Sequence, residues 1–426
     1  MRLAAVRRAQ KVRPASWWRS PIRGPWLTSV FGAVLLVGIP VEFITGLISY
    51  AAYNPRLAGN NPNTHTGILH FYLFTWVGGP SWLYRLTQGI HITLGLVLVP
   101  VVLAKLWSVI PKLFVIPPFR TIAQLLERAS LILLVGGIVF ELVTGIMNID
   151  YDYSFKFSFY DGHFLGAWLF IAGFITHVTL KLPKMVRALR SRRLRTELAT
   201  PLGETEPETY DGPDGLVAES PKAPSISRRG VLALVGGGSA AVFVMTAGQA
   251  IGGVTRQAAL LAPRGRSYGS GPTDFQVNRT AAAARITAAE TGSDWRLTVV
   301  GARTMTLTRD QLLAMPLATH SLPIACVEGW STVQDWTGVR LGALASMVGI
   351  DRAGTTLIES LERHGAYGRV ELAGGQVRAP QALLALRVNG VDLSPDHGYP
   401  ARIIIPGAPG VHNTKWVRQI TFSEAG

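Results

Sequence analysis

The stretch Leu322-Pro-Ile-Ala-Cys326-Val-Glu-Gly-Trp-Ser331 contains the only cysteine of a 426-residue chain. A single cysteine excludes a disulfide within the chain, and it excludes iron–sulfur or zinc sites that need several cysteines. By itself such a thiol can be a small buried hydrophobe, or its thiolate can bind a soft transition metal. The rest of the chain favours the metal.

The composition indicates a membrane protein joined to a soluble domain. Charged residues make up only 16% of the chain, the mean hydropathy is +0.27, and the apolar residues are concentrated in the first half. The formal net charge is +15. The basic residues stand at the ends of apolar segments, where membrane topology accounts for them, so nucleic acid is not an expected partner.

Four apolar segments predict membrane spans, because each approaches the ~20 residues that a bilayer core requires. They lie at 27–52, 83–108, 123–148 and 163–183. Residues 1–26 carry many arginines and no acid, which favours a cytoplasmic tail over a signal peptide. Basic residues are also frequent in the connection 105–128 and after the fourth span. The positive-inside rule therefore places the N-terminus in the cytoplasm and the loops 53–82 and 149–162 outside.

The four spans contain an internal repeat. Glu42-Phe-Ile-Thr-Gly46 follows Leu35-Leu-Val-Gly38 in the first span, as Glu141-Leu-Val-Thr-Gly145 follows Leu133-Leu-Val-Gly136 in the third. One ungapped register of the second and fourth spans pairs His91 with His163, Lys105 with His177, Pro111 with Pro183, and Lys112 with Lys184. We therefore expect residues 27–197 to form a duplicated helical hairpin that packs as an all-α transmembrane four-helix bundle.

The repeat makes His91 and His163 equivalent positions. Ionisable residues at membrane depth are costly and usually functional, and two facing imidazoles can form the axial pair of a b-type haem. His177 follows His163 by fourteen residues, which places it on the same helix face about 21 Å further along. That is the spacing of a second haem, but its partner in the repeat is Lys105. One haem is expected and a second is left open; the alternative is that these histidines only hydrogen-bond between helices.

With four spans and the His163/His177 spacing, this segment resembles the bacterial cytochrome b561-like and ferric-reductase-like families of di-haem membrane subunits. The sequence departs from that pattern because the fourth histidine is missing. The resemblance implies electron transfer between haem and a membrane partner such as quinone or quinol.

A linker and a fifth span are expected after the bundle. Residues 198–226 are rich in Pro, Gly, Glu and Asp and predict a disordered cytoplasmic linker. Ser227-Arg228-Arg229-Gly230 opens an apolar segment at 227–253 that resembles an internal twin-arginine signal, or is an ordinary span with basic flanks. Both interpretations make the chain a multi-pass cell-membrane protein whose residues 254–426 lie outside the cytoplasm. Gly236–Ser239 lacks the strand–turn–helix setting of a dinucleotide fingerprint.

Short strands and turns begin near residue 265 and predict an α+β domain over 265–426. The expected strands lie at 295–301, 304–308, 368–372 and 402–406. Short helices are expected at 309–315, 340–348 and 380–386.

Cys326-Val-Glu-Gly-Trp-Ser331 resembles the molybdenum-binding cysteine motif of the sulfite oxidase superfamily, and it is most similar to the catalytic subunit of periplasmic methionine sulfoxide reductase. The later segments Asn389–Leu393, Asp396–Arg402, Pro406-Gly407 and Asn413–Trp416 follow that superfamily in order and spacing. Phe275–Arg279 resembles its early pterin-contacting loop.

The resemblance implies a molybdenum held by one molybdopterin and by the Cys326 thiolate, with Glu328 and Trp330 beside the metal. The implied molybdopterin contacts are Asn278, Arg279, His397, Arg402, His412 and Lys415. Arginine and lysine suit the terminal phosphate of the pterin. The alternatives are that Trp330 is a core residue and that His412 is a turn residue.

Together these features predict a membrane-bound oxidoreductase that passes electrons from quinol through b-type haem to molybdenum and reduces a small or protein-bound sulfoxide. Sulfite oxidases bind their anion with arginines, some of them just after the cysteine, but none occurs from Val327 to Gly338. That absence favours the reductase over a dehydrogenase that oxidises sulfite and reduces quinone. A third interpretation is a non-catalytic haem electron relay with a vestigial molybdenum fold.

Overall fold

The computed structural model describes residues 20–57, 60, 74, 76, 79–113, 122–149, 155–157, 159–210, 216–217, 220–363 and 368–426. The chain forms two compact units, and each is described by itself. The first unit comprises Met1–Pro40, Gly95–Val143 and His163–Val242. The second comprises Val41–Leu94, Thr144–Gly162 and Phe243–Gly426.

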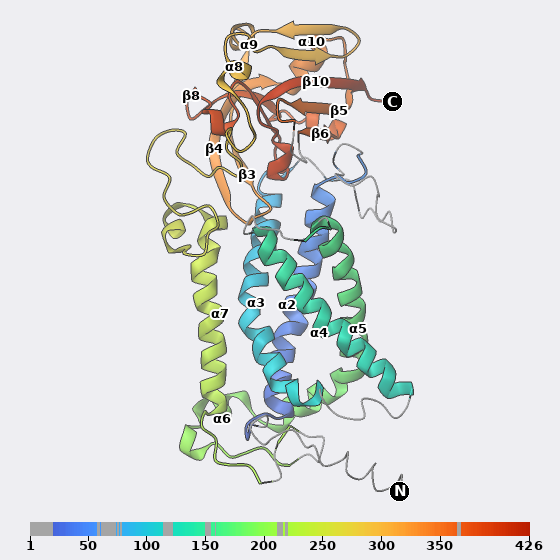
Figure 1. The fold of residues 1–426 in the computed structure, drawn as a ribbon, viewed down its shortest axis with the longest axis vertical. Coiled ribbons are helices and arrows are strands. Elements are labelled where there is room, and N and C mark those ends of the chain that lie inside the picture. The colour runs from blue at the N-terminus through green and yellow to red at the C-terminus, as the bar shows by residue number, and fades with distance from the viewer. Residues whose placement is uncertain are drawn as a thin grey trace. The chain divides into compact units, whose positions relative to one another are not determined.

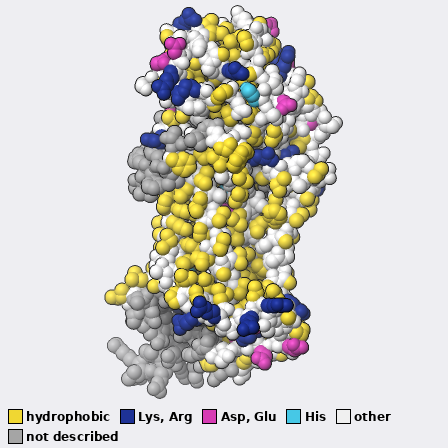
Figure 2. Space-filling view, turned by 180° about the vertical axis from the view of Figure 1, so that it is seen from behind, with side chains coloured by type: hydrophobic (Ala, Val, Ile, Leu, Met, Phe, Trp, Pro, Cys, Tyr) yellow, Lys and Arg dark blue, Asp and Glu magenta, His cyan; other side chains and the backbone are white. Residues whose placement is uncertain are grey.

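Five helices in the described part of the chain are long and apolar enough to cross a membrane (Figure 1). They are α2 (Pro25–Ala52), α3 (Leu83–Leu113), α4 (Ile122–Ile149), α5 (Phe159–Ser191) and α7 (Arg228–Ile251). Apolar side chains cover most of the helical part on the face that Figure 2 shows, and Ile132 and Leu234 are each 71% exposed. Such a surface is typical of helices that face lipid. The five predicted apolar segments are confirmed as helices.

Glycines bring the helices of each hairpin close together within the first unit. A Cβ atom on Gly38 of α2 would lie 2.8 Å from Leu98 Cδ1 of α3. One on Gly137 of α4 would lie 2.9 Å from Phe170 Cβ of α5. Small residues allow such close approach of membrane helices. The two contacts agree with a duplicated hairpin, and the packing of both hairpins as a four-helix bundle stays a prediction.

The C-terminal region is an α+β domain with two sheets (Figure 1). One sheet has the strand order β2-β1-β10-β5-β6, and the other has the order β3-β4-β7-β8, with β9 paired to β7. The strands are β1 (Leu297–Val300), β2 (Thr304–Leu307), β3 (Leu317–Ala325), β4 (Ser331–Arg340), β5 (Ala353–Ser360), β6 (Arg369–Leu372), β7 (Leu383–Val388), β8 (Val391–Asp392), β9 (Arg402–Ile404) and β10 (Val417–Glu424). The helical elements are α8 (Ala288–Thr291), α9 (Arg309–Leu313), α10 (Leu341–Met347), α11 (Gly374–Val377), η4 (Gly253–Ala258), η5 (Pro395–His397) and η6 (Gly410–His412).

One predicted helix of this domain is wrong. Residues 380–386 were expected to be helical because alanine and leucine favour helices. The structure instead places β7 there, paired on one side with β4 and on the other with β8 and β9. The first four residues of β7 are all buried. Burial in the middle of a sheet outweighs a weak intrinsic preference.

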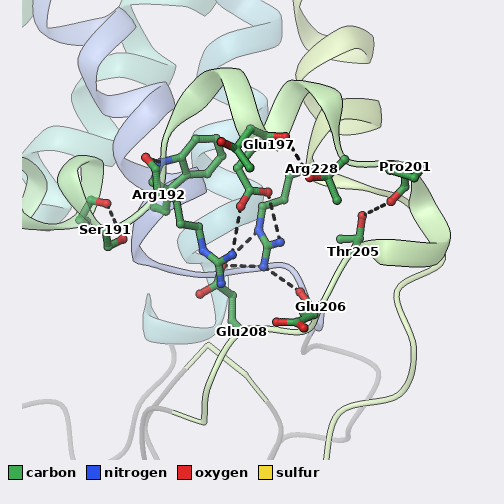
Figure 3. Close-up of polar contacts among 12 residues, drawn as sticks. Ser191, Arg192, Glu197, Pro201, Thr205, Glu206, Glu208 and Arg228 are labelled. Atoms are coloured by element: carbon green, nitrogen blue, oxygen red, sulfur yellow. Dashed lines mark hydrogen bonds and ion pairs between the residues drawn. The ribbon is translucent and has the colours of Figure 1, made fainter.

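The segment expected to be a disordered linker, residues 198–226, is described at 198–210, 216–217 and 220–226, and its disorder stays a prediction. It begins at the end of α6 (Leu194–Ala199), and its Leu202–Glu204 forms the short helix η3. The first residue of α7, Arg228, donates to Glu208 Oε1 at 2.7 Å and to Glu197 Oε2 at 3.4 Å (Figure 3). Only 1% of the Arg228 side chain is exposed. Glu208, one of the acidic residues of this segment, is therefore a partner of the buried Arg228, and this ion pair links residue 208 to the start of α7.

We expect Arg228→Ala to lower the free energy of unfolding by about 3 kcal/mol, since it leaves the carboxylates of Glu197 and Glu208 buried without this partner. Limited proteolysis of the purified protein should then cut within residues 198–226 much faster. The matched control is Arg229→Ala, because Arg229 is exposed and its removal should change neither measurement. Equal cleavage of both variants would contradict a stabilising role for these ion pairs.

Candidate active site

The single cysteine lies at the tip of a β-hairpin. Strands β3 and β4 pair in a register that ends with Ala325 opposite Ser331, so residues 326–330 form the turn between them. The Cys326 N–H donates to Trp330 O at 2.9 Å, and the Gly329 N–H donates to Cys326 O at 3.1 Å. Gly329 has a φ of +91°, which glycine adopts without strain. The residues of this Cys326 turn are therefore held in one conformation by the strand pairing behind them.

A cavity that opens to solvent lies beside the Cys326 turn, and its empty space, part of it in open solvent, is about 340 Å³. Its walls are formed by Phe275, Gln276, Asn278, Ile324, Cys326, Trp330, Thr332, His397, Arg402, Gly410 and Lys415. Six residues that the sequence predicted as site residues thus meet here, although they come from three distant segments. Of the others, Phe275 and Gln276 stand in a segment that the sequence singled out, whereas Thr332 and Gly410 had no recognisable pattern.

Three basic side chains that line the cavity, those of His397, Arg402 and Lys415, are shielded from water. The His397 ring stacks on Phe275 at 3.7 Å between centroids, and burial together with the charges of Arg402 and Lys415 lowers the pKa of His397 to about 3. Burial likewise lowers the pKa of Arg402 to about 9 and lowers that of Lys415 well below its usual value. An anionic ligand, such as a phosphate group, would stabilise the charged forms of the desolvated Arg402 and Lys415.

Polar atoms on the cavity walls fit a polar cofactor. Gln276 Oε1 and Arg402 Nε are buried and have no hydrogen-bond partner in the described part of the chain. The other two nitrogens of the Arg402 guanidinium donate to His397 O at 3.0 Å and Asn413 O at 3.1 Å, which fixes its orientation. Buried polar groups are normally paired, so these two atoms are suited to a ligand that supplies an acceptor and a donor.

The environment of Cys326 suits a metal ligand better than a free nucleophile. Burial, together with the negative charge of Glu328, raises the pKa of the Cys326 thiol. Such a thiol stays protonated at neutral pH, but coordination to a metal ion removes the proton. No group of three His, Cys, Asp or Glu residues within the described ranges could hold a metal ion. A metal at Cys326 would therefore need further ligands from a cofactor, as a dithiolene provides.

An arginine that the sequence argument missed reaches the Cys326 turn. Glu328 accepts hydrogen bonds from Trp330 Nε1 at 2.7 Å and from Arg264 Nε at 2.8 Å. A second Arg264 nitrogen donates to the other oxygen of Glu328. Arg264 lies far upstream of the turn in the sequence, where no motif marks it. Because it donates twice to Glu328, the two charges largely offset each other.

Two predicted pterin contacts do not line the cavity. The Arg279 side chain is 43% exposed and forms an ion pair with Glu362 at 2.9 Å, while its carbonyl accepts from Lys415 Nζ at 2.8 Å. The His412 ring is buried against Tyr53, with 5.9 Å between ring centroids. Arg279 thus positions Lys415 through its backbone, and His412 packs against Tyr53 instead of lining the cavity.

The buried His412 predicts a loss of stability in acid. Burial lowers its pKa to about 4, below the ~6.5 of an unfolded histidine. Between these two pKa values the unfolded chain binds a proton that the folded chain does not. The free energy of unfolding therefore decreases as the pH is lowered, by about 2 kcal/mol at pH 5 relative to neutral pH. The apparent thermal midpoint should therefore drop less between pH 7.5 and pH 5 in His412→Gln than in the wild type. His320→Gln is the control; equal pH dependence in wild type and His412→Gln would contradict the argument.

The repeated histidines each lie beside the glutamate of their own repeat. In the second unit, His91 Nδ1 lies 3.1 Å from Glu42 Oε2 and 3.1 Å from Thr45 Oγ1. In the first unit, His163 Nδ1 lies 3.1 Å from Glu141 Oε2. A histidine that binds a metal through Nε2 commonly donates its Nδ1–H to a carboxylate. Each histidine thus has a glutamate oxygen near Nδ1 within its own unit, and the binding of haem by His91 and His163 stays a prediction.

The third predicted haem ligand is less well supported. His177 lies within α5, and its partner in the repeat, Lys105, donates from Nζ to Thr28 O of α2 at 2.7 Å. That bond ties the lysine to a neighbouring helix within the first unit. A haem that used both His177 and Lys105 would have to bind the same lysine nitrogen.

Comparison with known proteins assigns the class of the C-terminal domain. Residues 283–426 match the family described as "Oxidoreductase molybdopterin binding domain". The chain therefore carries a molybdopterin-binding oxidoreductase domain.

The relatives specify the kind of domain further. The chain is 31% identical to the uncharacterized oxidoreductase YuiH of Bacillus subtilis (strain 168) over 134 residues, which cover 30% of this chain and 66% of that protein. It is 32% identical to the sulfite oxidase of Arabidopsis thaliana over 99 residues (20% and 25%), and 38% identical to an NADPH nitrate reductase of Phytophthora infestans over 101 residues (22% and 11%). The domain is of the sulfite oxidase and nitrate reductase type. The match spans less than two thirds of each of these relatives.

Among solved structures, the sulfane dehydrogenase SoxCD of Paracoccus pantotrophus matches with 23% identity and a TM-score of 0.29, over 31% of this chain and 39% of that chain. The assignment above depends on the sequence matches alone.

Proposed function

We propose that this chain is a membrane-bound molybdenum oxidoreductase that takes electrons from quinol through b-type haem and removes an oxygen atom from a sulfoxide. Its molybdopterin would lie in the cavity, with Cys326 as the protein ligand of the metal. The observation that carries the proposal is the meeting of Cys326 with His397, Arg402 and Lys415 around that cavity.

Different residues of the cavity are proposed to bind different parts of the cofactor. Arg402 and Lys415 supply the cations for the pterin phosphate, and Asn278 and Gln276 offer amide groups for its ring. Molybdenum, when bound, supplies a two-electron centre for oxygen-atom transfer. Cys326 fixes the position of that centre, because the strand pairing of β3 and β4 fixes the turn.

The membrane half is proposed to bind haem through His91 and His163. The support is that both Nδ1 atoms lie 3.1 Å from a glutamate oxygen. A haem supplies one-electron transfer when bound. The distribution of basic residues supports a cytoplasmic N-terminus and an extracytoplasmic molybdenum domain. Cutting or labelling the C-terminal domain from outside intact cells would test this topology.

The balanced reaction requires a two-electron donor. A sulfoxide, two electrons and two protons give a sulfide and water, and the oxidation of one quinol to quinone supplies both electrons and both protons. No nicotinamide or flavin fingerprint was found in the sequence, which agrees with a donor from the membrane.

Sulfite oxidation with reduction of quinone is the second candidate, and one observation favours it. Arg264 reaches the Cys326 turn, although no arginine follows the cysteine in the sequence. An arginine near the metal suits an oxyanion. Its double hydrogen bond to Glu328 offsets that charge, and for this reason we place the sulfoxide reductase first.

Stopped-flow absorbance of the purified full-length protein distinguishes the two directions of electron flow, from haem to molybdenum or from molybdenum to haem. Molybdenum, pterin and haem contents are measured first; a protein without molybdenum would contradict both candidates. We expect methionine sulfoxide to reoxidise the reduced haem and sulfite to have no effect on oxidised haem. Reduction of the haem by sulfite would instead establish the dehydrogenase.

A further inference from the structure

The Cys326 turn contacts helix α3 within the second unit. Gln88 Nε2 of α3 donates to Val327 O at 2.9 Å, and Val327 directly follows the cysteine. Gln88 is 2% exposed, and its Oε1 accepts from Ser49 Oγ of α2 at 2.8 Å. Both ends of the Gln88 amide are therefore fixed, so this side chain joins two apolar helices to the turn.

A second contact lies at Gly329. A Cβ atom on Gly329 would stand 2.7 Å from Ile92 Cγ2 of α3 and 3.2 Å from Gln249 Nε2 of α7. These separations are shorter than normal contacts between heavy atoms, so the turn packs directly against α3 and α7 at this point. Gln88 and Ile92 are four residues apart and therefore lie on one face of α3.

The beginning of β4 is tied to the end of α7 in the same region. Ser331 Oγ donates to Ala250 O at 2.7 Å, and Arg85 of α3 donates to the same carbonyl group at 3.2 Å. Thus α3 contacts the turn through Gln88 and Ile92 and also contacts the helix end that binds Ser331.

We propose that Gln88 is a positioning residue that couples the Cys326 turn to α3, the helix that carries His91. This inference rests on the proposed function, in which electrons pass from the His91 haem to the metal held by Cys326. His91 lies three residues after Gln88, on the same side of α3. The path from His91 to Cys326 then consists of one helical turn, the Gln88 side chain, a single hydrogen bond and the Val327 peptide. Each catalytic cycle sends two electrons along it, one at a time, and quinol supplies both.

The first test compares two electron donors in Gln88→Leu, which removes the hydrogen bond while keeping a similar volume. Turnover driven by quinol should fall about tenfold, because the turn loses its fixed place on α3. Turnover driven by a reduced viologen dye, which reduces the molybdenum domain directly, should stay within about twofold, and the haem midpoint potential should not move. Thr87→Val is the control, since the Thr87 hydroxyl donates to Leu83 O and Tyr84 O of its own helix.

The comparison of donors distinguishes coupling from simple damage. An equal loss with both donors would mean that Gln88 only stabilises the fold, and no loss with either would mean that electrons cross elsewhere; both results overturn the proposal. If Gln88→Leu does not fold, Ser49→Ala keeps Gln88 but removes the hydroxyl that orients it. That variant should show the same selective loss, of about threefold.

The second test does not depend on haem. Gly329→Ala places a methyl group against Ile92, and Ile92→Ala makes room for it, so the double variant should be more stable than the sum of the two single effects predicts. Thermal midpoints of protein prepared without cofactors measure this coupling. Additive effects would contradict the contact between α3 and the turn. If the purified protein lacks haem, the proposed function is contradicted, but the comparison of the two single variants with the double variant still tests the contact.

Discussion

Replacing Cys326 by serine should abolish oxygen-atom transfer with either electron donor. The expected loss exceeds about a thousandfold, or ~4 kcal/mol at 1.36 kcal/mol per tenfold. A serine hydroxyl is a hard and weakly acidic ligand, and a buried site makes its ionisation still less favourable. The metal would thus lose the only thiolate that the described residues lining the cavity can supply.

The pterin should nevertheless remain partly bound in this variant, because Arg402 and Lys415 are unchanged. Pterin content is measured by fluorescence after release, and the metal environment by electron paramagnetic resonance after partial reduction. Serine is close to cysteine in size, so the apparent thermal midpoint of the cofactor-free protein should differ little. Thr319→Ser on β3 is the control for expression and folding. Full activity in the serine variant would remove Cys326 from the site.

The sequence was sufficient for those features that depend on local pattern. The apolar segments could be predicted as helices because length and hydropathy are properties of a continuous stretch of sequence. The two halves of the repeat are seen as two similar pairs of side chains, Glu42 with His91 and Glu141 with His163. The residues around Cys326 could be listed from a family resemblance. Their arrangement around one cavity could not, because β3, β9 and the segment near residue 275 are far apart in the sequence and meet only in the folded domain.

Long-range charge pairing was not accessible to the sequence. The absence of an arginine after Cys326 was taken as evidence about the substrate, but Arg264 enters from far upstream and binds Glu328. The composition of residues 198–226, which predicts disorder, likewise does not reveal that Glu208 meets Arg228. In both cases a charged residue that looks unpaired in the sequence has an ion-pair partner that is distant in the sequence and close in the folded chain.

Replacing His91 or His163 by alanine should remove the b-type haem and abolish turnover driven by quinol, whereas turnover driven by a reduced viologen should persist. Each histidine is proposed as one axial ligand, and loss of either leaves the iron without that bond. Reduced-minus-oxidised absorbance of the purified variants measures the haem, and molybdenum content confirms that the catalytic domain is loaded. His320→Gln, a histidine of β3, should retain the haem in full.

The glutamates allow a finer test of the same site. Glu42→Gln and Glu141→Gln keep the size of the side chain but replace the carboxylate that accepts from Nδ1, and such changes typically cost about 10–100-fold in metal affinity. The haem of these variants should therefore be present after purification but lost faster to a haem acceptor such as apomyoglobin. His177→Ala then decides the number of haems: an unchanged ratio of haem to protein would mean that one haem accounts for the site, and a halved ratio would mean two. Retention of all haem in both His91→Ala and His163→Ala would instead leave these histidines as partners of their glutamates, and would remove the membrane half from the electron path.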